Sequence, residues 1–419
     1  MSGRCIFHVD VNSAFLSWSA VKKLKDEPGC VDLRTIPSAV AGDVETRHGI
    51  ITAKSIPAKK YGISTAEPVV KALQKCPELV LVKSDFKTYR EYSRLFIEIL
   101  QKYSDYVQQV SIDEAFMDMS GTVYAKDPVA AAVRIKNEIY ATLGFTVNVG
   151  ISVNKLLAKM ASDFEKPDKV HTLYPEEIEK KMWGLPIGDL FGCGRRTAVK
   201  LKNIGINTIG EAAKTDINVL ISLLGEKSGE YIHDSANGLD DSEVSVEERE
   251  AKSYSNESTT LVDIDEANFQ TEGLKIVHEL AASVSRRMKR DNVYAGTIEA
   301  SVKTTEFKRR SHQRKLMDST NDEKVIEENA KALFKEMLYG EKGLFRQGKK
   351  LRLIGVGASN LDRQEYKQMS FLDMLSGNQL VMSEEIKKPY EKAEKDNKLK
   401  QMIEKIDAKF GKGVIKKGI

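Results

Sequence analysis

The sequence predicts an α/β protein with several domains, on three observations. The chain has 419 residues, of which 41% are hydrophobic and 30% charged, a length and balance typical of a multi-domain globular protein. Residues 5–9 are apolar and β-prone, and apolar positions at helical spacing follow over residues 15–24. Residues 106–116 and 297–303 alternate apolar and polar side chains, as half-buried strands do. Strands and helices are therefore mixed along the chain.

Acidic residues stand at the ends of two of these predicted strands. Asp10 would close a buried strand, where adjacent loops can present ligands to a substrate. The strand over residues 106–116 brings the adjacent acids Asp113 and Glu114 toward a core, and they share one site only if the strand bends there. Taken alone, an Asp at a strand end is more typical of a cap or turn, and an Asp-Glu pair is more typical of a solvated hairpin. Together they indicate a site for Mg²⁺ or Mn²⁺ and phosphoryl transfer, because desolvated neighbouring carboxylates need a compensating positive charge.

Three motifs, in their order and spacing, resemble the signatures of the Y-family DNA polymerases. They are His-Val-Asp-Val-Asn-Ser-Ala-Phe at residues 8–15, Ser-Ile-Asp-Glu-Ala at 111–115 and Val-Gly-Ile-Ser-Val-Asn-Lys at 149–155. Residues 52–62 are similar to the fingers segment of that family, and the resemblance continues to about residue 375. It points to the bacterial polymerase IV group or its UmuC-like relatives.

The resemblance implies a hand-shaped polymerase with a mixed-sheet palm, small fingers, a helix-hairpin-helix thumb and a β-rich little-finger domain. The expected boundaries are 1–24 and 76–165 for the palm, 25–75 for the fingers, 166–239 for the thumb, 240–252 for a linker, 253–362 for the little finger, and 363–419 for a clamp-binding peptide and basic tail. The implied activity is translesion synthesis, in which deoxynucleotides are added to a primer 3′ end with low fidelity and without proofreading.

The family's catalytic acids fall on Asp10, Asp113 and Glu114. The same three side chains and the backbone carbonyl of Val11 would be the metal ligands for two Mg²⁺ ions, with Mn²⁺ as a substitute. Such ions activate the primer 3′-hydroxyl and stabilise charge on the pyrophosphate leaving group.

The nucleotide-binding positions carried over from the family are Ala14, Phe15, Ile56, Lys59 and Lys166. Phe15 would lie under the deoxyribose and exclude a 2′-hydroxyl; its alternative role is in the apolar face of a helix capped by Ser13. Many relatives carry Tyr and Arg at the positions of Ile56 and Lys59, so we expect weaker nucleotide binding than in those relatives. Asn12 also departs from the pattern, since an acid is common there.

Two regions are predicted to bind DNA. Residues 286–315 contain ten Lys or Arg and three acids, which suits a phosphate backbone, although a solvated surface is the common alternative. The glycine-rich turn at 191–197 resembles a helix-hairpin-helix, whose amides can bind phosphate; an ordinary interhelical turn is the alternative. The expected DNA-contacting residues are Gly192, Gly194, Arg195, Lys303, Lys308, Arg309 and Arg310. Residues 240–250, with six acids and one Arg, predict a solvated linker.

A short segment near the end resembles the clamp-binding peptide of bacterial polymerases, with its usual Leu-Phe order reversed. Its residues are Gln368, Met369, Phe371 and Leu372. As a clamp-binding peptide, the segment would place its apolar side chains in a groove of the partner protein. The alternative is the start of a helix that contributes two residues to the core. Beyond it, residues 386–419 are Lys-rich with apolar positions at helical spacing, which indicates a tail helix on the enzyme or on DNA.

The remaining features set limits on the class of protein. Four widely separated cysteines without a C-x-x-C motif predict reduced thiols and no zinc site. No run of about 18 apolar residues and no signal-peptide pattern is present, so we expect a cytoplasmic protein without a membrane partner. The expected partners of this monomer are primer-template DNA, deoxynucleoside triphosphates and the sliding clamp. Two rivals stay open: a clamp-tethered DNA-binding protein with decayed catalysis, and a palm-based nucleotide cyclase.

Overall fold

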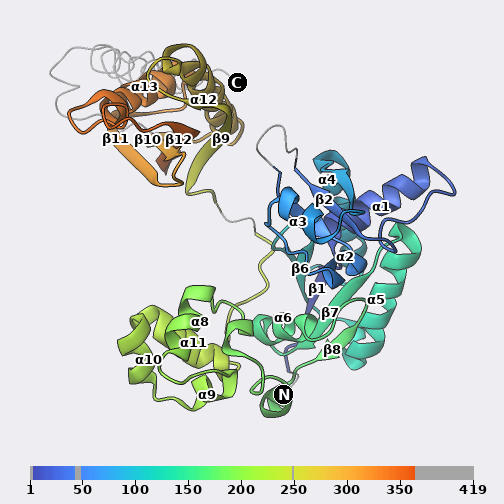
Figure 1. Ribbon diagram of the computed structural model, residues 1–419. Coiled ribbons are helices and arrows are strands. Elements are labelled where there is room, and N and C mark those ends of the chain that lie inside the picture. Colours follow the sequence, from blue (N-terminus) through green and yellow to red (C-terminus); the bar gives the residue numbers. More distant parts are fainter. Residues whose placement is uncertain (1–2, 43–48, 248–249, 364–419) are drawn as a thin grey trace, which may run out of the picture.

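The first half of the chain is built around a five-stranded mixed sheet in the computed structural model, which describes residues 3–42, 49–247 and 250–363 (Figure 1). The strand order is β5-β6-β1-β7-β8, and the central strand β1 runs antiparallel to both of its neighbours. The strands are β1 (Ile6–Val11), β5 (Val107–Gln109), β6 (Glu114–Asp118), β7 (Val147–Ser152) and β8 (Val170–Thr172).

The two faces of this sheet have different roles, because successive side chains of β1 point to opposite sides. Phe7 and Val9 belong to the large core shared with α4 (Phe86–Gln101) and α5 (Pro128–Leu143). On the other side, Ile6 packs with residues of β6 and of α6 (Lys155–Asp163). Asp10 is on the same side of β1 as Ile6, so the strand presents its acid toward α6.

The continuous strand expected over residues 106–116 is wrong. The segment is a hairpin in which β5 and β6 pair antiparallel and residues 110–113 form the turn. The amides of Val110 and Ser111 both donate to the carbonyl of Glu114, at 3.0 and 3.3 Å. The turn supplies the bend that two adjacent acids require, since Asp113 lies in the turn and Glu114 opens β6.

A smaller three-stranded sheet lies beside the first, in the order β3-β2-β4. Its elements are β2 (Ser38–Ala41), β3 (Ile51–Lys54), β4 (Val80–Lys83), α2 (Ile56–Lys60) and α3 (Val69–Lys75), and α1 (Ala14–Asp26) precedes them. Ser55 begins α2 by accepting a hydrogen bond from the Ala58 amide at 3.1 Å. Ser13 precedes α1 in a left-handed conformation and makes no side-chain cap, which differs from the expectation.

The next part of the chain is helical around its own core. Its helices are α7 (Ile178–Lys181), α8 (Arg195–Lys202), α9 (Ile209–Lys214), α10 (Ile217–Leu224) and α11 (Glu226–Ala236), and short 3₁₀ turns occupy Pro175–Glu177 and Ile187–Asp189. The core includes Ile187, Leu201 and Leu220. A further 3₁₀ turn, Val123–Lys126, belongs to the first part, between β6 and α5. The element before the glycine-rich turn is the 3₁₀ turn at Ile187–Asp189, where a helix was expected.

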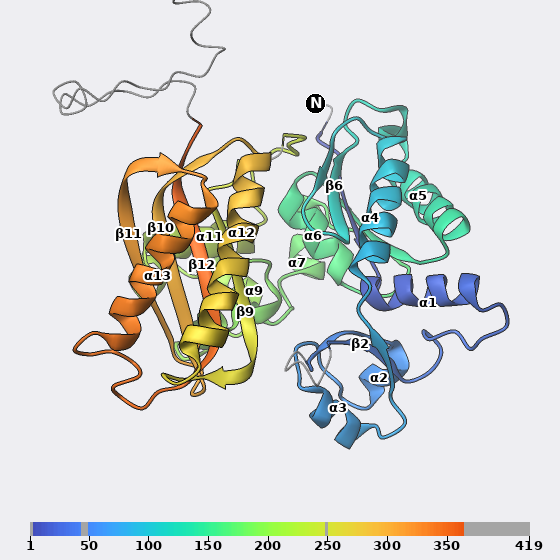
Figure 2. The same cartoon turned by 90° about the horizontal axis from the view of Figure 1, so that it is seen from above.

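The last described part is an antiparallel sheet covered on one side by two helices (Figure 2). The order is β11-β10-β12-β9, and the elements are β9 (Ser253–Ile264), a π turn (Phe269–Gly273), α12 (Leu274–Arg290), β10 (Tyr294–Thr304), β11 (Arg309–Thr320), α13 (Glu323–Tyr339) and β12 (Leu351–Asp362). The apolar positions Ile298, Ala300 and Val302 of β10 lie in the core with these helices. The basic strand β11 is at the sheet edge, as expected.

The acidic segment before β9 is exposed at most of its positions, as its composition predicts, but it is also anchored to the rest of the chain. Over residues 240–247 it lies against the first sheet and α6, with Val244 buried to 8% exposure beside Ile6, Phe116 and Ala158. A carboxylate oxygen of Asp240 accepts from the Leu156 amide at 3.0 Å, so it caps the start of α6. Asp240, at least, has a structural role, because the free amides at the start of α6 need a hydrogen-bond acceptor.

All four cysteines, Cys5, Cys30, Cys76 and Cys193, are free thiols. Burial, with a contribution from Asp118, raises the pKa of Cys5 to about 11. Across the described residues, no helix is long and apolar enough to cross a bilayer.

Candidate active site

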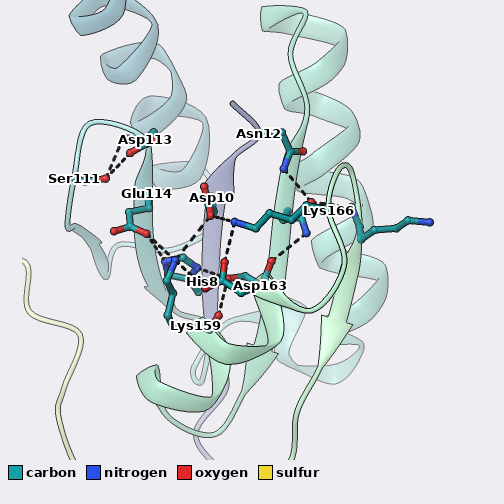
Figure 3. Close-up of polar contacts among 12 residues, drawn as sticks. His8, Asp10, Asn12, Ser111, Asp113, Glu114, Lys159, Asp163 and Lys166 are labelled. Carbon is teal, nitrogen blue, oxygen red and sulfur yellow. Dashed lines mark hydrogen bonds and ion pairs between the residues drawn. The ribbon is translucent and has the colours of Figure 1, made fainter. Parts of the chain in front are cut away.

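Asp10 and Glu114 are direct neighbours across two strands. The β1–β6 register pairs Asp10 with Glu114, which places both side chains on the face of the sheet that α6 covers. Asp113 lies beside them in the turn, where its carbonyl accepts from the Val11 amide at 2.9 Å. The structure therefore brings the three predicted acids and Val11 to one end of the sheet (Figure 3).

Two lysines lie among these acids. Lys159 Nζ is 3.0 Å from Glu114 Oε2 and 3.8 Å from Asp10 Oδ2. Lys166 forms an ion pair with Asp10, and its Nζ is 2.8 Å from Asp163 Oδ1. Although burial acts in the opposite direction, Asp10 and Asp163 raise the pKa of Lys166. Both lysines thus place positive charge beside the carboxylates.

The two adjacent acids have opposite pKa shifts. His8 and Lys159 hold the pKa of Glu114 at about 2, against the effect of its partial burial. Burial raises the pKa of Asp113, despite a hydrogen bond of 2.6 Å from Ser111 Oγ to its Oδ1. Figure 3 shows Asp113 turned toward Ser111. A cation beside Asp113 would stabilise its ionised form.

These residues fit a magnesium site in their chemistry. Three carboxylates and a main-chain carbonyl are the hard oxygen donors that Mg²⁺ binds. Within the described parts of the chain, no three acidic, histidine or cysteine side chains already surround a common metal position. The positive charge between Asp10 and Glu114 comes instead from Lys159 and Lys166.

Sequence reasoning missed two residues of this site, Lys159 and His8. Lys159 lies one helical turn after Lys155 of the third motif and one turn before Asp163, a spacing that places it on the α6 face toward β1. His8 belongs to the first motif but had no assigned role. His8 is completely buried, which is unusual for a polar residue. A histidine within a predicted core strand was therefore the sequence feature that could have indicated a functional role.

Phe15 lies at the start of α1, packed on a second aromatic ring. Its ring stacks on that of Tyr89, with centroids 4.6 Å apart and planes 13° from parallel. Tyr89 is fully buried, and its hydroxyl is 3.0 Å from Ser19 Oγ. Phe86 contacts both rings edge-on from the exposed side. The neighbouring Ala14 is buried. Phe15 thus rests on a fixed support, with only part of its ring accessible.

Ile56 and Lys59 lie on α2, in the smaller three-stranded module. Both are exposed, and Ile56 retains 45% of its surface. Lys59 lies close enough to Lys54 to lower the pKa of Lys54, after the larger effect of burial. An anion binding here would therefore meet more than one lysine.

The predicted DNA contacts of the helical part differ in their surroundings. Gly192 has a φ of +81°, and a Cβ there would lie 2.3 Å from Tyr231 Oη, so this glycine is required by its packing against Tyr231. At Gly194 an added Cβ would meet nothing within 4 Å, and Arg195 is the first residue of α8. The surface beside Gly194 is therefore open, but its amide already donates to the Gly192 carbonyl at 3.1 Å.

The predicted DNA contacts of the C-terminal sheet fall into two groups. Lys303 pairs with Arg309 across β10 and β11, and both are on the sheet face away from the core of Ile298 and Val302. Arg310 alternates to the other side, where it donates to the Lys342 carbonyl. Lys308 lies in the turn between the strands beside Glu306. The structure therefore groups Lys303 with Arg309 and separates Arg310 from them.

Three parts of the chain match known protein families. Residues 9–163 match the impB/mucB/samB family, residues 188–240 the thumb domain of DNA polymerase iota, and residues 251–371 the impB/mucB/samB C-terminal domain. DNA polymerase IV of Clostridium acetobutylicum is 42% identical over 371 residues, 88% of this chain and 90% of the relative. The chain belongs to the Y family of DNA polymerases.

Other similarities agree with this family. DNA polymerase IV 1 of Bacillus subtilis is 35% identical over 99% of this chain and 92% of its own length. Among solved structures, a Y-family chimera of Dbh and Dpo4 superimposes with a TM-score of 0.70, at 22% identity, and covers 85% of this chain and 98% of its own. The resemblance read from the motifs and the hand-shaped fold class are both confirmed, in the polymerase IV branch. The predicted clamp peptide at residues 368–372 lies outside the described residues.

Proposed function

We propose that this polymerase performs translesion synthesis, extending a primer on damaged templates at Asp10, Asp113 and Glu114. As a Y-family member it is a DNA-directed DNA polymerase. The observation that carries the proposal is the direct pairing of Asp10 with Glu114, with Asp113 in the adjoining turn. Paired, partly buried acids are costly in a structural role and suit a site that binds cations. Low fidelity and the absence of proofreading belong to the same proposal.

Two Mg²⁺ ions, or Mn²⁺ as a substitute, are the proposed cofactors, held by the three acids and the Val11 carbonyl. When bound, Mg²⁺ supplies activation of the primer 3′-hydroxyl and neutralisation of the triphosphate. The chain itself provides Lys166 and Lys159, whose ammonium groups lie where anionic phosphates would approach Asp10 and Glu114. On nucleotide binding, Lys166 exchanges its carboxylate partners for phosphate oxygens.

The incoming nucleotide would lie between the first sheet and the α2 module. Lys59 and Ile56 of α2 approach the triphosphate, and Phe15 with Ala14 lies below the sugar. Since Phe15 is held by the buried Tyr89, its ring cannot retreat to admit a 2′-hydroxyl. Selection of deoxyribonucleotides therefore follows from packing.

DNA would be held on both sides of this site by contacts to its phosphate backbone, without sequence-specific contacts to its bases. Arg195 offers an amide and a guanidinium at the start of α8 beside Gly194. Lys303 and Arg309 offer cations on the open face of the C-terminal sheet, where Arg309 would exchange its partner Glu257, 3.0 Å away, for phosphate. Arg310 and Lys308 are secondary candidates because of their different orientation and partner. Gly192 contributes through the shape of the turn.

Clamp binding is a separate part of the proposal and depends on the sequence alone. Replacing Gln368, Phe371 and Leu372 by Ala should abolish binding to a bacterial sliding clamp and leave extension of short primers unchanged. Unaltered clamp affinity would remove this part of the proposal without affecting the rest.

Primer extension on undamaged and abasic templates with Mg²⁺ tests the proposed function. The wild type should extend past the lesion, Asp113→Ala should lose synthesis on both templates, and Phe15→Ala should incorporate ribonucleotides. Phe86→Ala, which removes an exposed ring from the same aromatic group, is the matched control and should still exclude ribonucleotides. DNA binding without any synthesis by the wild type would instead favour the tethered protein with decayed catalysis.

A further inference from the structure

Asn12, the residue that departs from the acid common in relatives, is one half of a buried amide pair. Its Nδ2 donates to Asn148 Oδ1 at 3.1 Å, and the two side chains are 9% and 0% exposed. Asn12 follows β1, and Asn148 lies on β7 directly opposite Asp10. The pair therefore sits immediately behind the strand end that carries the catalytic acid.

Both amides hold the segment that contains Lys166. Asn148 Nδ2 donates to the carbonyls of Ser162 and Glu165, at 3.1 and 2.7 Å. Its Oδ1 also accepts from the Lys169 amide at 3.2 Å, and Asn12 Oδ1 accepts from the Asp168 amide at 2.9 Å. Main-chain groups on both sides of Lys166 are thus bound by two side chains from neighbouring strands.

The network sets the orientation of each amide. Asn148 must direct its NH₂ toward two carbonyls, so its oxygen necessarily faces Asn12. Residue 12 must then be a donor on that side and an acceptor on the other, which an amide satisfies. A carboxylate in this position would place an oxygen against Asn148 Oδ1 and leave a buried polar contact unsatisfied.

We infer that Asn12 and Asn148 are positioning residues, which hold residues 162–169 so that Lys166 is directed to Asp10 and, in turn, to the nucleotide triphosphate. This inference rests on the nucleotide-binding role proposed above for Lys166. Asp168 is further fixed by Lys136 of α5, whose Nζ is 2.9 Å from Asp168 Oδ1. The amide pair and this ion pair fix the main chain on both sides of Lys166. The Lys166 side chain is thereby directed at Asp10 and Asp163.

The test combines a double-mutant cycle with hydrogen exchange in the full chain. The variants are Asn12→Ala, Lys166→Ala and the double variant, with Asn329→Ala on α13 as a control whose side chain bonds only within its own helix. Asn12→Ala should speed exchange of the Asp168 and Lys169 amides and raise the KM for deoxynucleotides about tenfold, with a smaller change in kcat. Asn12→Asp should have at least as large an effect, and Asn329→Ala should behave as the wild type.

If Asn12 affects the KM only by positioning Lys166, Asn12→Ala should not change the KM further in a Lys166→Ala background. Full additivity in the double variant, or unchanged exchange of the Asp168 and Lys169 amides, would overturn the inference. An unchanged KM in Lys166→Ala would overturn it together with the proposed role of Lys166. Failure of the proposed function is distinguishable, because the wild type itself would then not extend a primer.

Discussion

The imidazole of His8 supports the carboxylate of Glu114 from within the protein core. Nε2 lies 3.3 Å from Glu114 Oε2 without the alignment of a regular hydrogen bond, and Nδ1 is 2.8 Å from Ser162 Oγ. Burial lowers the pKa of His8, so the ring is neutral, and its contact with Ser162, whose hydroxyl donates to the Lys159 carbonyl, fixes the ring toward Glu114. His8, which contacts no substrate, therefore helps to orient the carboxylate of Glu114, a proposed metal ligand.

Removing this support should weaken catalysis without unfolding the sheet. We expect His8→Leu to lower kcat roughly 10- to 100-fold, the cost typical of losing a partner of a metal ligand, and to raise the Mg²⁺ concentration required for half-maximal rate. Primer extension over a Mg²⁺ titration measures both effects. His233→Leu, at a partly exposed histidine of α11, is the control, and wild-type kinetics in His8→Leu would show that Glu114 is oriented by Lys159 alone.

Lys59→Arg should strengthen nucleotide binding. A guanidinium can form two parallel hydrogen bonds to phosphate where an ammonium is a point charge, so we expect the KM for deoxynucleotides to fall roughly two- to tenfold. Steady-state single-nucleotide insertion measures it. Lys60→Arg, the neighbouring exposed lysine of α2, should leave KM unchanged. An equal KM for Lys59→Arg and wild type would contradict the proposed triphosphate contact.

Val244→Asp should release the acidic segment from the first sheet. Burial of a valine side chain contributes about 1.5–3 kcal/mol, and a buried carboxylate would add its own desolvation cost. We expect faster proteolysis within residues 239–250 and a lower melting temperature of the N-terminal half. Val246→Asp, at a position with 55% of its surface exposed, should change neither. Equal protease sensitivity of the two variants would show that Val244 does not hold the segment.

The stability of the C-terminal domain should decrease as the pH rises above 6.5 and through the folded-state pKa of His278. Glu327 Oε2, 2.9 Å from His278 Nδ1, raises the pKa of this histidine above its ordinary value of 6.5. Because the folded-state pKa is raised, the ion pair stabilises the fold fully below pH 6.5 and is lost as the pH passes the higher folded value.

Hydrogen exchange of α12 and α13 at pH 6 and pH 8.5, corrected for intrinsic rates, measures this dependence. His278→Gln should lose most of the difference in protection between the two conditions. A variant that retains the full pH dependence would assign it to other groups.

Several features were predictable because they depend on neighbours in the sequence. The apolar run before Asp10 forms β1, the apolar–polar alternation at residues 297–303 lies in β10, and the basic strand follows at the sheet edge. Side-chain periodicity and residue type determine such elements locally. The motif spacing also identified the family, because it preserves the order of the functional segments.

Composition was not sufficient where a segment found a partner far away in the chain. The acids of residues 240–247 indicated solvent, but Asp240 meets the start of α6 and Val244 meets the sheet. The apolar–polar alternation over residues 106–116 fits one continuous strand as well as a hairpin. It therefore could not predict the turn at Asp113.

The sequence by itself determined the family and the hand-shaped fold class, and from them it predicts which acids, aromatic residue and lysine form the proposed site. The tertiary structure alone decided that Asp10 opposes Glu114, that His8 and Lys159 support that pair, and that Asn12 meets Asn148. These relationships join residues that are far apart in the sequence. They depend on strand register and on the packing of α6, which no local pattern encodes.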